Sequence, residues 1–329
     1  MAGATPASNA QIGRAAGLKM GKATRDAFGA ALKDLGNEFP NVVVVDGDVG
    51  NSTRTEVFAK AFPHRSFNVG IAESNMVGVA GGLAATGKIP VVSSFACFLL
   101  CNAYDQIRMS VAYPGMNVKL VGSHAGISIG EDGASQMGIE DVALACSLPG
   151  FTVVVPADAA SARKATRAML EHTGPVYLRC GRIEVPEVYT DDAPFQLGKA
   201  SQLRDGNDVT IIANGLTVGM ALDAAVALSA NGIHARVLDM HTVKPLDEAA
   251  IVAAAKETGR IVVAEEHLHA GGLGSAVAAV VVRTRPVPME FVNLGDTYAE
   301  SGDPAGLLQK YGLTAEAIVA AVQRVRNRG

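Results

Sequence analysis

The chain of 329 residues is 49% hydrophobic and 18% charged, contains 36 glycines and carries a formal net charge of −4. Its length predicts about two domains, and its weak negative charge gives no electrostatic basis for binding nucleic acid or an anionic membrane. The longest apolar run, "VVSSFACFLLC", is about half as long as a bilayer requires, so we expect buried strand and helix there and no membrane segment.

The first 20 residues, "MAGATPASNAQIGRAAGLKM", are small and polar and lack an apolar core of signal-peptide length. We therefore expect residues 1–20 to form a flexible or partner-bound arm. The four cysteines show neither a CxxC pair nor metal-ligand spacing, which predicts isolated buried thiols in a reducing cytoplasm. They are Cys97, Cys101, Cys146 and Cys180.

Strand and helix patterns alternate through residues 21–185, which predicts the first domain. The strand candidates are apolar on both faces, as in a parallel sheet covered by helices. They lie at 42–45, 89–94, 117–123, 151–157 and 175–180. Helical spacing occurs at 22–35, 73–87, 96–112, 139–147 and 158–172.

Prolines and acidic residues then interrupt the alternation, and we place a linker at residues 186–206. The alternation resumes through residues 207–329 and predicts a second, smaller domain. The expected fold class is α/β, with two doubly wound three-layer αβα domains and mainly parallel sheets.

The stretch "VVVVDGDVGNST" ends a strand in acidic residues and resembles the GDG…NN pattern with which thiamine diphosphate enzymes hold Mg²⁺. The second glycine of that pattern is replaced by Val49, and Asn75 is single. We therefore predict no metal site here. Asp46 and Asp48 are expected to be loop and cap residues at the end of the strand.

Glu73 lies in "NVGIAESNMVGVAGG", an apolar stretch without Lys or Arg. These residues alone favour a structural role, with the acid at a helix N-terminus and Gly78 and Gly81 permitting close helix packing. Phe95 and Phe98 are three apart and could equally be core aromatics.

A glycine-rich loop, "GSHAGISIGEDGASQ", contains His124, Asp132 and Gln136, and a histidine at this place has about even odds of a functional role. Arg25, Ser52 and Arg182 have structural alternatives, namely a helix-surface charge, a helix cap and a linker salt bridge.

From Lys22 onward the chain resembles the C-terminal half of transketolase. The matching segments occur in family order and include "KATRDAFG", "GIAESNMVGVAGG", "SSFACF", "YDQIRM", "LRCGR", "VKPLD" and "EEHLHAGGLGS", besides the two stretches quoted above. The resemblance implies a thiamine diphosphate pyrimidine-binding domain followed by a transketolase C-terminal domain.

The resemblance implies a cofactor role for four of these residues. Glu73 would be the catalytic acid, sharing a proton with a pyrimidine nitrogen of thiamine diphosphate, and an apolar setting favours its protonated form. Phe95 and Phe98 would stack on the aminopyrimidine, and Gln136 would lie near the cofactor.

It likewise implies that five residues bind the sugar. His124 would contact substrate and act catalytically, and Asp132 would reach a sugar hydroxyl. Arg25, Ser52 and Arg182, together with His124, would grip the terminal phosphate, a task that suits the bidentate guanidinium.

Two segments bear on substrate size and on metal binding. Asn102 stands near a position where many transketolases carry a basic residue, which leaves the preferred sugar chain length open. Glu265, Glu266, His267 and His269 look like metal ligands in isolation, but the resemblance assigns their segment to structure and interface. We therefore predict no metal ligands in this chain.

A complete transketolase also needs a domain with the GDG…NN motif. We therefore expect a partner subunit that carries this motif, holds Mg²⁺ (or Ca²⁺) and the diphosphate, and assembles with this chain as an α2β2 heterotetramer. The expected reaction is transfer of a two-carbon ketol unit from a ketose phosphate such as xylulose 5-phosphate to an aldose phosphate such as ribose 5-phosphate. The alternatives are a beta subunit of a 2-oxo acid dehydrogenase decarboxylase, a deoxyxylulose-phosphate-synthase-like enzyme, and a non-catalytic stabilising subunit.

Overall fold

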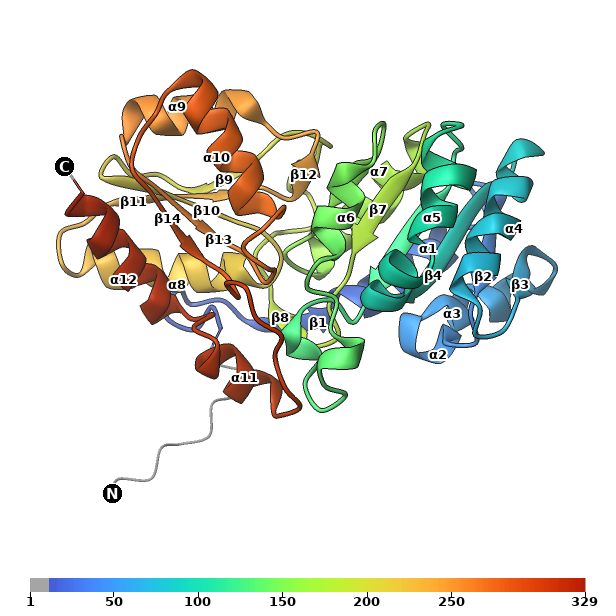
Figure 1. Ribbon diagram of the computed structural model, residues 1–329. Coiled ribbons are helices and arrows are strands. Elements are labelled where there is room, and N and C mark those ends of the chain that lie inside the picture. The colour runs from blue at the N-terminus through green and yellow to red at the C-terminus, as the bar shows by residue number, and fades with distance from the viewer. Residues whose placement is uncertain (1–11, 329) are drawn as a thin grey trace.

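The computed structural model describes residues 12–328 and shows two α/β units side by side (Figure 1). Both units have mainly parallel sheets with helices on both faces, so the predicted fold class is confirmed. None of the described helices is long and apolar enough to cross a membrane.

The first unit is built on a seven-stranded sheet in the order β12-β6-β7-β5-β4-β2-β3. Six of its strands are parallel to their neighbours and come from the N-terminal half of the chain. These are β2 (Val42–Asp46), β3 (Ser66–Asn68), β4 (Ile89–Phe95), β5 (Lys119–Ser123), β6 (Thr152–Val154) and β7 (Val176–Arg179). The valines of β2 and β4 are buried, as expected for strands covered on both faces, whereas the edge strand β3 is largely exposed.

The helices of this unit connect successive strands. The α-helices are α1 (Thr24–Leu35), α2 (Gly50–Thr53), α3 (Thr55–Ala61), α4 (Glu73–Ala85), α5 (Tyr104–Gln106), α6 (Asp141–Ser147) and α7 (Ala159–Glu171). Two π-helical segments, η3 (Phe98–Asn102) and η4 (Ile107–Ala112), flank α5. Short 3₁₀ turns lie at η2 (Pro63–Arg65), η5 (Ile127–Ile129) and η6 (Ala134–Gln136).

The second unit has a five-stranded sheet in the order β14-β13-β10-β11-β9. Four strands are parallel: β10 (Val209–Ala213), β11 (Ala235–Asp239), β13 (Ile261–Ala264) and β14 (Met289–Val292). Its helices are α8 (Thr217–Ser229), α9 (Glu248–Glu257), α10 (Leu273–Thr284), α11 (Pro304–Lys310) and α12 (Ala315–Arg326).

In the described part of the chain, five strands lie where the sequence did not predict a strand: the short β1 (Met20–Ala23), β3 and β8 (Glu184–Pro186), and two that bear on how the units are joined. The strand β9 (Ser201–Arg204) falls inside the stretch expected to be a linker, and pairs antiparallel with β11. The strand β12 (Thr242–Lys244) comes from the C-terminal half of the chain but pairs antiparallel with β6 of the first sheet. Lys244 anchors this crossing strand, because its Nζ donates to the carbonyls of Cys146 and Leu148. The two units are therefore joined by a shared sheet as well as by chain connectivity.

The N-terminal segment, expected to be a flexible or partner-bound arm, is held against this chain's own units where the structure describes it. Asp223 on α8 accepts hydrogen bonds from the backbone N–H groups of Gly13 at 2.7 Å and Ala16 at 2.8 Å. Further along, β1 (Met20–Ala23) pairs antiparallel with β8 (Glu184–Pro186). Residues 12–20 are thus held against both units, and residues 1–11 of the expected arm lie outside the described residues.

Replacing Asp223 by alanine is expected to lower the free energy of unfolding by about 1–3 kcal/mol, because two backbone N–H groups lose a charged acceptor. Urea unfolding measures this loss, and limited proteolysis should show new cleavage within residues 12–17. The control is Asp223→Asn, which keeps a carbonyl acceptor and should lose less. If Asp223→Ala resists proteolysis at residues 12–17 as well as wild type does, the proposed anchor is wrong.

A buried acid holds the chain between the two units. The hydroxyl of Tyr189 donates to Oδ2 of Asp239, at the end of β11, over 2.7 Å. Burial raises the pKa of Asp239 to about 7, and the nearby Asp158 carboxylate adds to this rise against the effect of the Tyr189 bond. The folded chain therefore binds the Asp239 proton more tightly than the unfolded chain does.

This difference predicts a pH dependence of stability. The ordinary pKa of an aspartate is 3.8, so the stabilising proton of Asp239 is present below that value and is lost as the pH rises toward about 7. Asp239→Asn should therefore gain stability relative to wild type between pH 4 and pH 8, by about 3–4 kcal/mol. Urea unfolding at both pH values measures the gain. An unchanged difference between the two proteins would contradict the assignment.

Candidate active site

Glu73 is the first residue of α4 and lies beside the carboxyl end of β4. Its side chain is 8% exposed, and Oε1 lies 3.5 Å from the Ser94 hydroxyl, a long contact for a hydrogen bond. The N-terminus of α4 places partial positive charge near the carboxylate. Of the two glycines predicted to permit helix packing, Gly81 does so against the backbone of Ser110, whereas Gly78 faces open space. Because its contact with Ser94 is long, the Glu73 carboxylate can accept a hydrogen bond from a further partner.

Three rings stack on one another at the carboxyl end of β4. Phe95 ends β4, and its ring is nearly parallel to that of Phe98, at a centroid distance of 5.4 Å and an angle of 8°. On Phe95 the imidazole of His124 also stacks, at 3.9 Å and 12°. The sequence indicated the Phe pair, but the stacking of His124 on Phe95 was not predicted. This stack connects the expected cofactor residues with the expected sugar residues.

His124 follows β5 directly and is almost fully buried. Its Nε2 lies 2.7 Å from Nη1 of Arg25, and because a guanidinium can only donate, Nε2 must accept. The proton is then on Nδ1, which donates to the Ser123 hydroxyl at 2.7 Å. Burial, together with the charges of Arg25, Arg182 and Arg54, lowers the pKa of His124 to about 3. The imidazole is therefore neutral at any physiological pH.

Arginines surround this histidine. Arg25 also donates to the Ser52 carbonyl at 3.1 Å, while Arg182 donates to the Ile129 carbonyl at 2.7 Å and to Asp132 Oδ2 at 3.3 Å. Burial lowers the pKa of Arg25, and repulsion from Arg54 and Arg182 acts in the same direction.

One donor in this cluster is unused. The buried Nε of Arg25 has no hydrogen-bond partner in the part of the chain that the structure describes. A cluster of guanidinium groups that repel one another and leave a donor free suits an anion.

The sequence interpretation missed Arg54, whose charge acts on both Arg25 and His124. It treated Asp48 only as a loop residue, whereas Asp48 accepts a hydrogen bond from Asn68 at 2.9 Å. These two and His124 are the non-glycine residues with positive φ among residues 12–328, at 68°, 66° and 56°. Such conformations are costly for residues other than glycine and concentrate at functional sites. Sequence alone carries little signal for them.

Gln136 and Asp46 are hydrogen-bonded to neighbouring residues of the chain. Gln136, in η6, has its side-chain oxygen hydrogen-bonded to the Ser135 hydroxyl, and the structure gives it no direct contact with the Phe pair. Asp46 is the last residue of β2 rather than a helix cap, since the N-cap of α2 is Val49. Its carboxylate accepts from the Val49 N–H at 3.0 Å and from the Thr55 hydroxyl at 2.7 Å.

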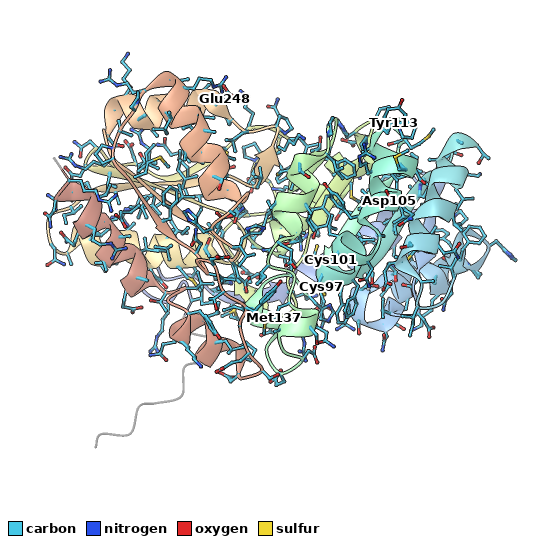
Figure 2. All side chains as sticks on the ribbon, viewed as in Figure 1. Cys97, Cys101, Asp105, Tyr113, Met137 and Glu248 are labelled. Carbon is cyan, nitrogen blue, oxygen red and sulfur yellow. The ribbon has the colours of Figure 1, made fainter. Side chains whose placement is uncertain are left out.

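The structure places all four cysteines and the side chains that resemble metal ligands in the sequence. All four cysteines are free thiols. Only Cys97 and Cys180 are buried, whereas Cys101 is exposed and Cys146 is half-buried, which corrects the expectation of four buried thiols. Figure 2 shows Cys97 and Cys101 close to each other. Within residues 12–328, no group of three or more His, Cys, Asp or Glu side chains is placed to hold a metal ion.

Two protein families match this chain, one in its N-terminal part and one in its C-terminal part. Residues 20–187 match the family described as transketolase, pyrimidine binding domain, and residues 198–318 match transketolase, C-terminal domain. The chain is 43% identical to the 6-deoxy-6-sulfo-D-fructose transketolase subunit SqwH of Clostridium sp. (strain MSTE9), over 92% of this chain and 94% of that protein. It is 40% identical to one of the subunits of apulose-4-phosphate transketolase from Phocaeicola vulgatus, over 90% and 95%.

A solved structure is similar to this chain over almost its whole length. A structure titled split gene transketolase, inactive beta4 tetramer, superposes with a TM-score of 0.86 at 49% identity, covering 93% of this chain and 99% of that chain. The chain belongs to the transketolase family. Within the family it is of the C-terminal-subunit type, because it matches such subunits over more than nine tenths of their length and corresponds to about half of a one-chain transketolase such as that of Rattus norvegicus, of which it covers 49% at 41% identity.

Membership of this family implies thiamine diphosphate, and the site fits the pyrimidine end of that cofactor. The buried Glu73 has capacity for another hydrogen bond, and the Phe95 and Phe98 rings are parallel.

Proposed function

We propose that this chain is the pyrimidine-binding subunit of a two-chain transketolase that moves a two-carbon ketol unit from a ketose phosphate to an aldose phosphate. The observation that carries this proposal is the stack Phe98–Phe95–His124, which joins the two phenylalanines proposed for the cofactor to a histidine bonded to Arg25. Xylulose 5-phosphate and ribose 5-phosphate are the proposed representative sugars. The names of the two relatives mention a sulfosugar and apulose 4-phosphate, so the sugar itself is a matter for assay.

At the cofactor end, each residue has a distinct task. Thiamine diphosphate, when bound, supplies the carbanion-stabilising chemistry that ketol transfer requires. Glu73 holds a proton at the pyrimidine nitrogen, and its burial excludes competing water. Phe95 and Phe98 orient the pyrimidine plane, and Gln136 is proposed to border it after turning from Ser135.

At the sugar end, Arg25, Ser52 and Arg182 are proposed to bind the phosphate together with His124, and Asp132 a sugar hydroxyl. The geometry suggests an order of events. Nε2 of His124 is occupied by Arg25, so a phosphate that draws Arg25 away would free this acceptor for a substrate hydroxyl. His124 then takes up a proton at Nε2 while Nδ1 remains bonded to Ser123.

The proposed partner is an N-terminal transketolase subunit whose GDG…NN motif holds Mg²⁺ (or Ca²⁺) and the diphosphate in an α2β2 complex in the cytoplasm. Exposed apolar side chains support a covering subunit: Ile71, two residues before Glu73, is 81% exposed. Tyr113, which follows η4, is a second such side chain at 84% exposed. The solved split-gene relative is described as inactive when it is a tetramer of beta chains alone.

The assay mixes this chain with its N-terminal subunit, thiamine diphosphate and Mg²⁺, and follows ketol transfer from xylulose 5-phosphate to ribose 5-phosphate. We expect transfer by the mixture and none by either chain alone. Decarboxylation of 2-oxo acids without ketol transfer would instead favour a 2-oxo acid dehydrogenase beta subunit. Condensation of pyruvate with glyceraldehyde 3-phosphate would favour a deoxyxylulose-phosphate-synthase-like enzyme, and no turnover would favour a non-catalytic subunit.

A further inference from the structure

The β5–α6 loop, residues 124–140, carries three of the proposed site residues, and its backbone packs closely against the second unit of the chain. Gly126 has a φ of 80°, and a Cβ at this position would overlap the carboxylate of Glu266. Gly130 has a φ of 87°, and a Cβ there would lie 2.7 Å from Pro304 at the start of α11. The loop backbone therefore packs against two separate segments of the second unit, one at Glu266 and one at Pro304.

Hydrogen bonds fix both ends of this loop to residues 266–268. At the beginning, Oε1 of Glu266 accepts from the backbone N–H of Ser128 at 2.7 Å. Near the end, the Leu268 N–H donates to the Ile139 carbonyl at 2.9 Å. His267 Nδ1 is bonded to the Leu268 carbonyl, which leaves Nε2 to accept from the N–H of Ala143 at 3.3 Å, just beyond the loop. The segment that looked like a metal site in the sequence thus serves as a set of acceptors and donors for the other unit.

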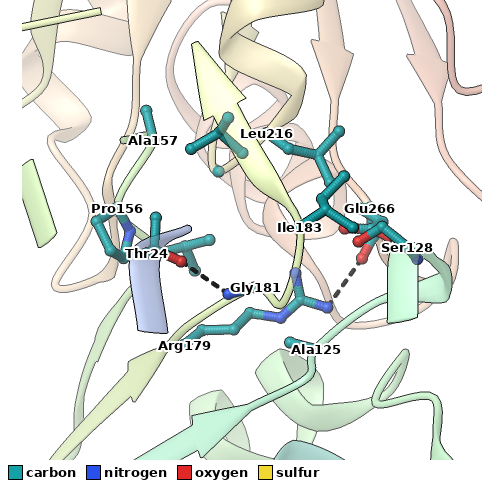
Figure 3. Close-up of a pocket in the computed structure, with 13 residues that line it drawn as sticks. Thr24, Ala125, Ser128, Pro156, Ala157, Arg179, Gly181, Ile183, Leu216 and Glu266 are labelled. Atoms are coloured by element: carbon teal, nitrogen blue, oxygen red, sulfur yellow. Dashed lines mark hydrogen bonds between the residues drawn. The ribbon is translucent and has the colours of Figure 1, made fainter. Parts of the chain in front are cut away.

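Glu266 contacts both the β5–α6 loop and β7. It is 5% exposed and lines a small cavity of about 30 Å³ between the two units. Figure 3 shows Arg179 reaching from β7 toward Glu266, whose backbone carbonyl accepts from Arg179 Nη2 at 2.9 Å. Arg179 is itself fixed by a buried ion pair with Asp141 at 2.8 Å. Both the side chain and the backbone of Glu266 are therefore held in place by the first unit.

We propose that Glu266 is a positioning residue for the β5–α6 loop, through which the C-terminal unit sets the geometry of His124 and hence the affinity for the sugar phosphate. His124 lies two residues before Gly126 and is held at a φ of 56°, a conformation that persists only when its surroundings fix it. The substrate role of the loop rests on the proposed function, whereas the positioning itself does not.

The test compares two adjacent buried glutamates. Glu266→Ala removes the acceptor of the Ser128 N–H. Glu265→Ala is the matched control, since Glu265 is equally buried and accepts from Leu273 and Gly274 within the second unit. In the full chain, we expect hydrogen exchange at Ser128 to be about 5- to 100-fold faster in Glu266→Ala than in Glu265→Ala after correction for global stability. Glu266→Gln should restore slow exchange, because its amide oxygen can accept from Ser128.

The complex with the N-terminal subunit gives the second measurement. Glu266→Ala should raise KM for the sugar phosphate at least fivefold, while Glu266→Gln and Glu265→Ala stay within about twofold of wild type. If Glu266→Ala does not fold, Glu266→Asp, which shortens the side chain by one methylene, gives the same comparison. Equal exchange at Ser128 in the two alanine variants, or an unchanged KM, would overturn the proposal. A wild-type complex without transfer but with the expected exchange contrast would reject the proposed function and keep the positioning role.

Discussion

Glu73→Gln is expected to reduce ketol transfer by the complex about 10²- to 10⁴-fold, the range over which a positioned acid or base contributes to catalysis. Glutamine has the shape of glutamate but cannot hold or release a proton at the pyrimidine nitrogen. Because Glu73 is buried at the start of α4 and its contact with Ser94 is long, the substitution should disturb the fold little. Steady-state kinetics with saturating cofactor measure the effect as a fall in kcat.

The control for this variant is Glu171→Gln, an identical chemical change at an exposed glutamate near the end of α7. It should leave kcat unchanged. Thermal unfolding of both variants shows whether a loss of activity comes from misfolding. If folded Glu73→Gln retains a kcat close to that of wild type, another group activates the cofactor and the assignment of Glu73 is wrong.

Arg25→Ala is expected to raise KM for the phosphorylated substrate about 10- to 150-fold, the effect of losing charge-assisted hydrogen bonds worth about 1.5–3 kcal/mol. The same variant removes the donor to Nε2 of His124 and one of the charges that lower the pKa of His124, so this pKa should rise above its value of about 3. Kinetics measure the first effect, and an NMR titration of the His124 ring measures the second.

Two further variants separate charge from geometry. Arg25→Lys keeps the positive charge but loses the planar fork, so it should bind phosphate with intermediate affinity. Arg163→Ala removes an exposed arginine that pairs with Asp191 away from the cluster, and should leave KM unchanged. An Arg25→Ala variant that loses equal affinity for phosphorylated and unphosphorylated sugars would contradict phosphate binding by this cluster.

Much of the fold could be predicted because the strands have a simple pattern. Runs such as Val42–Asp46 are apolar on both faces, and only a parallel sheet covered by helices buries them that way. The same pattern could not predict β12, because three residues carry no periodicity and their partner in β6 lies far away in the sequence. Nor could it predict that Asp223 holds the segment before β1, since a single carboxylate on a helix does not reveal which backbone it faces.

The candidate site was predictable from motifs but not from their geometry. Arg25 and His124 are 99 residues apart, and nothing in the sequence indicates that one nitrogen of each meets at 2.7 Å. The positive φ of His124 and Arg54 is set by tertiary packing, and sequence preferences point to glycine for such positions. Glu265 and Glu266 were separable from metal ligands only by resemblance, whereas the structure shows each bonded to backbone N–H groups.

The claim on which this account depends is that the chain supplies the acid while another chain supplies the diphosphate and metal site. Calorimetric titration of thiamine diphosphate with Mg²⁺ into this chain, alone and after addition of its N-terminal subunit, tests it most directly. We expect little or no binding to the chain alone and tight binding to the mixture, since the diphosphate and its metal supply most of the charge interactions. Tight, Mg²⁺-dependent binding by this chain alone would contradict the account.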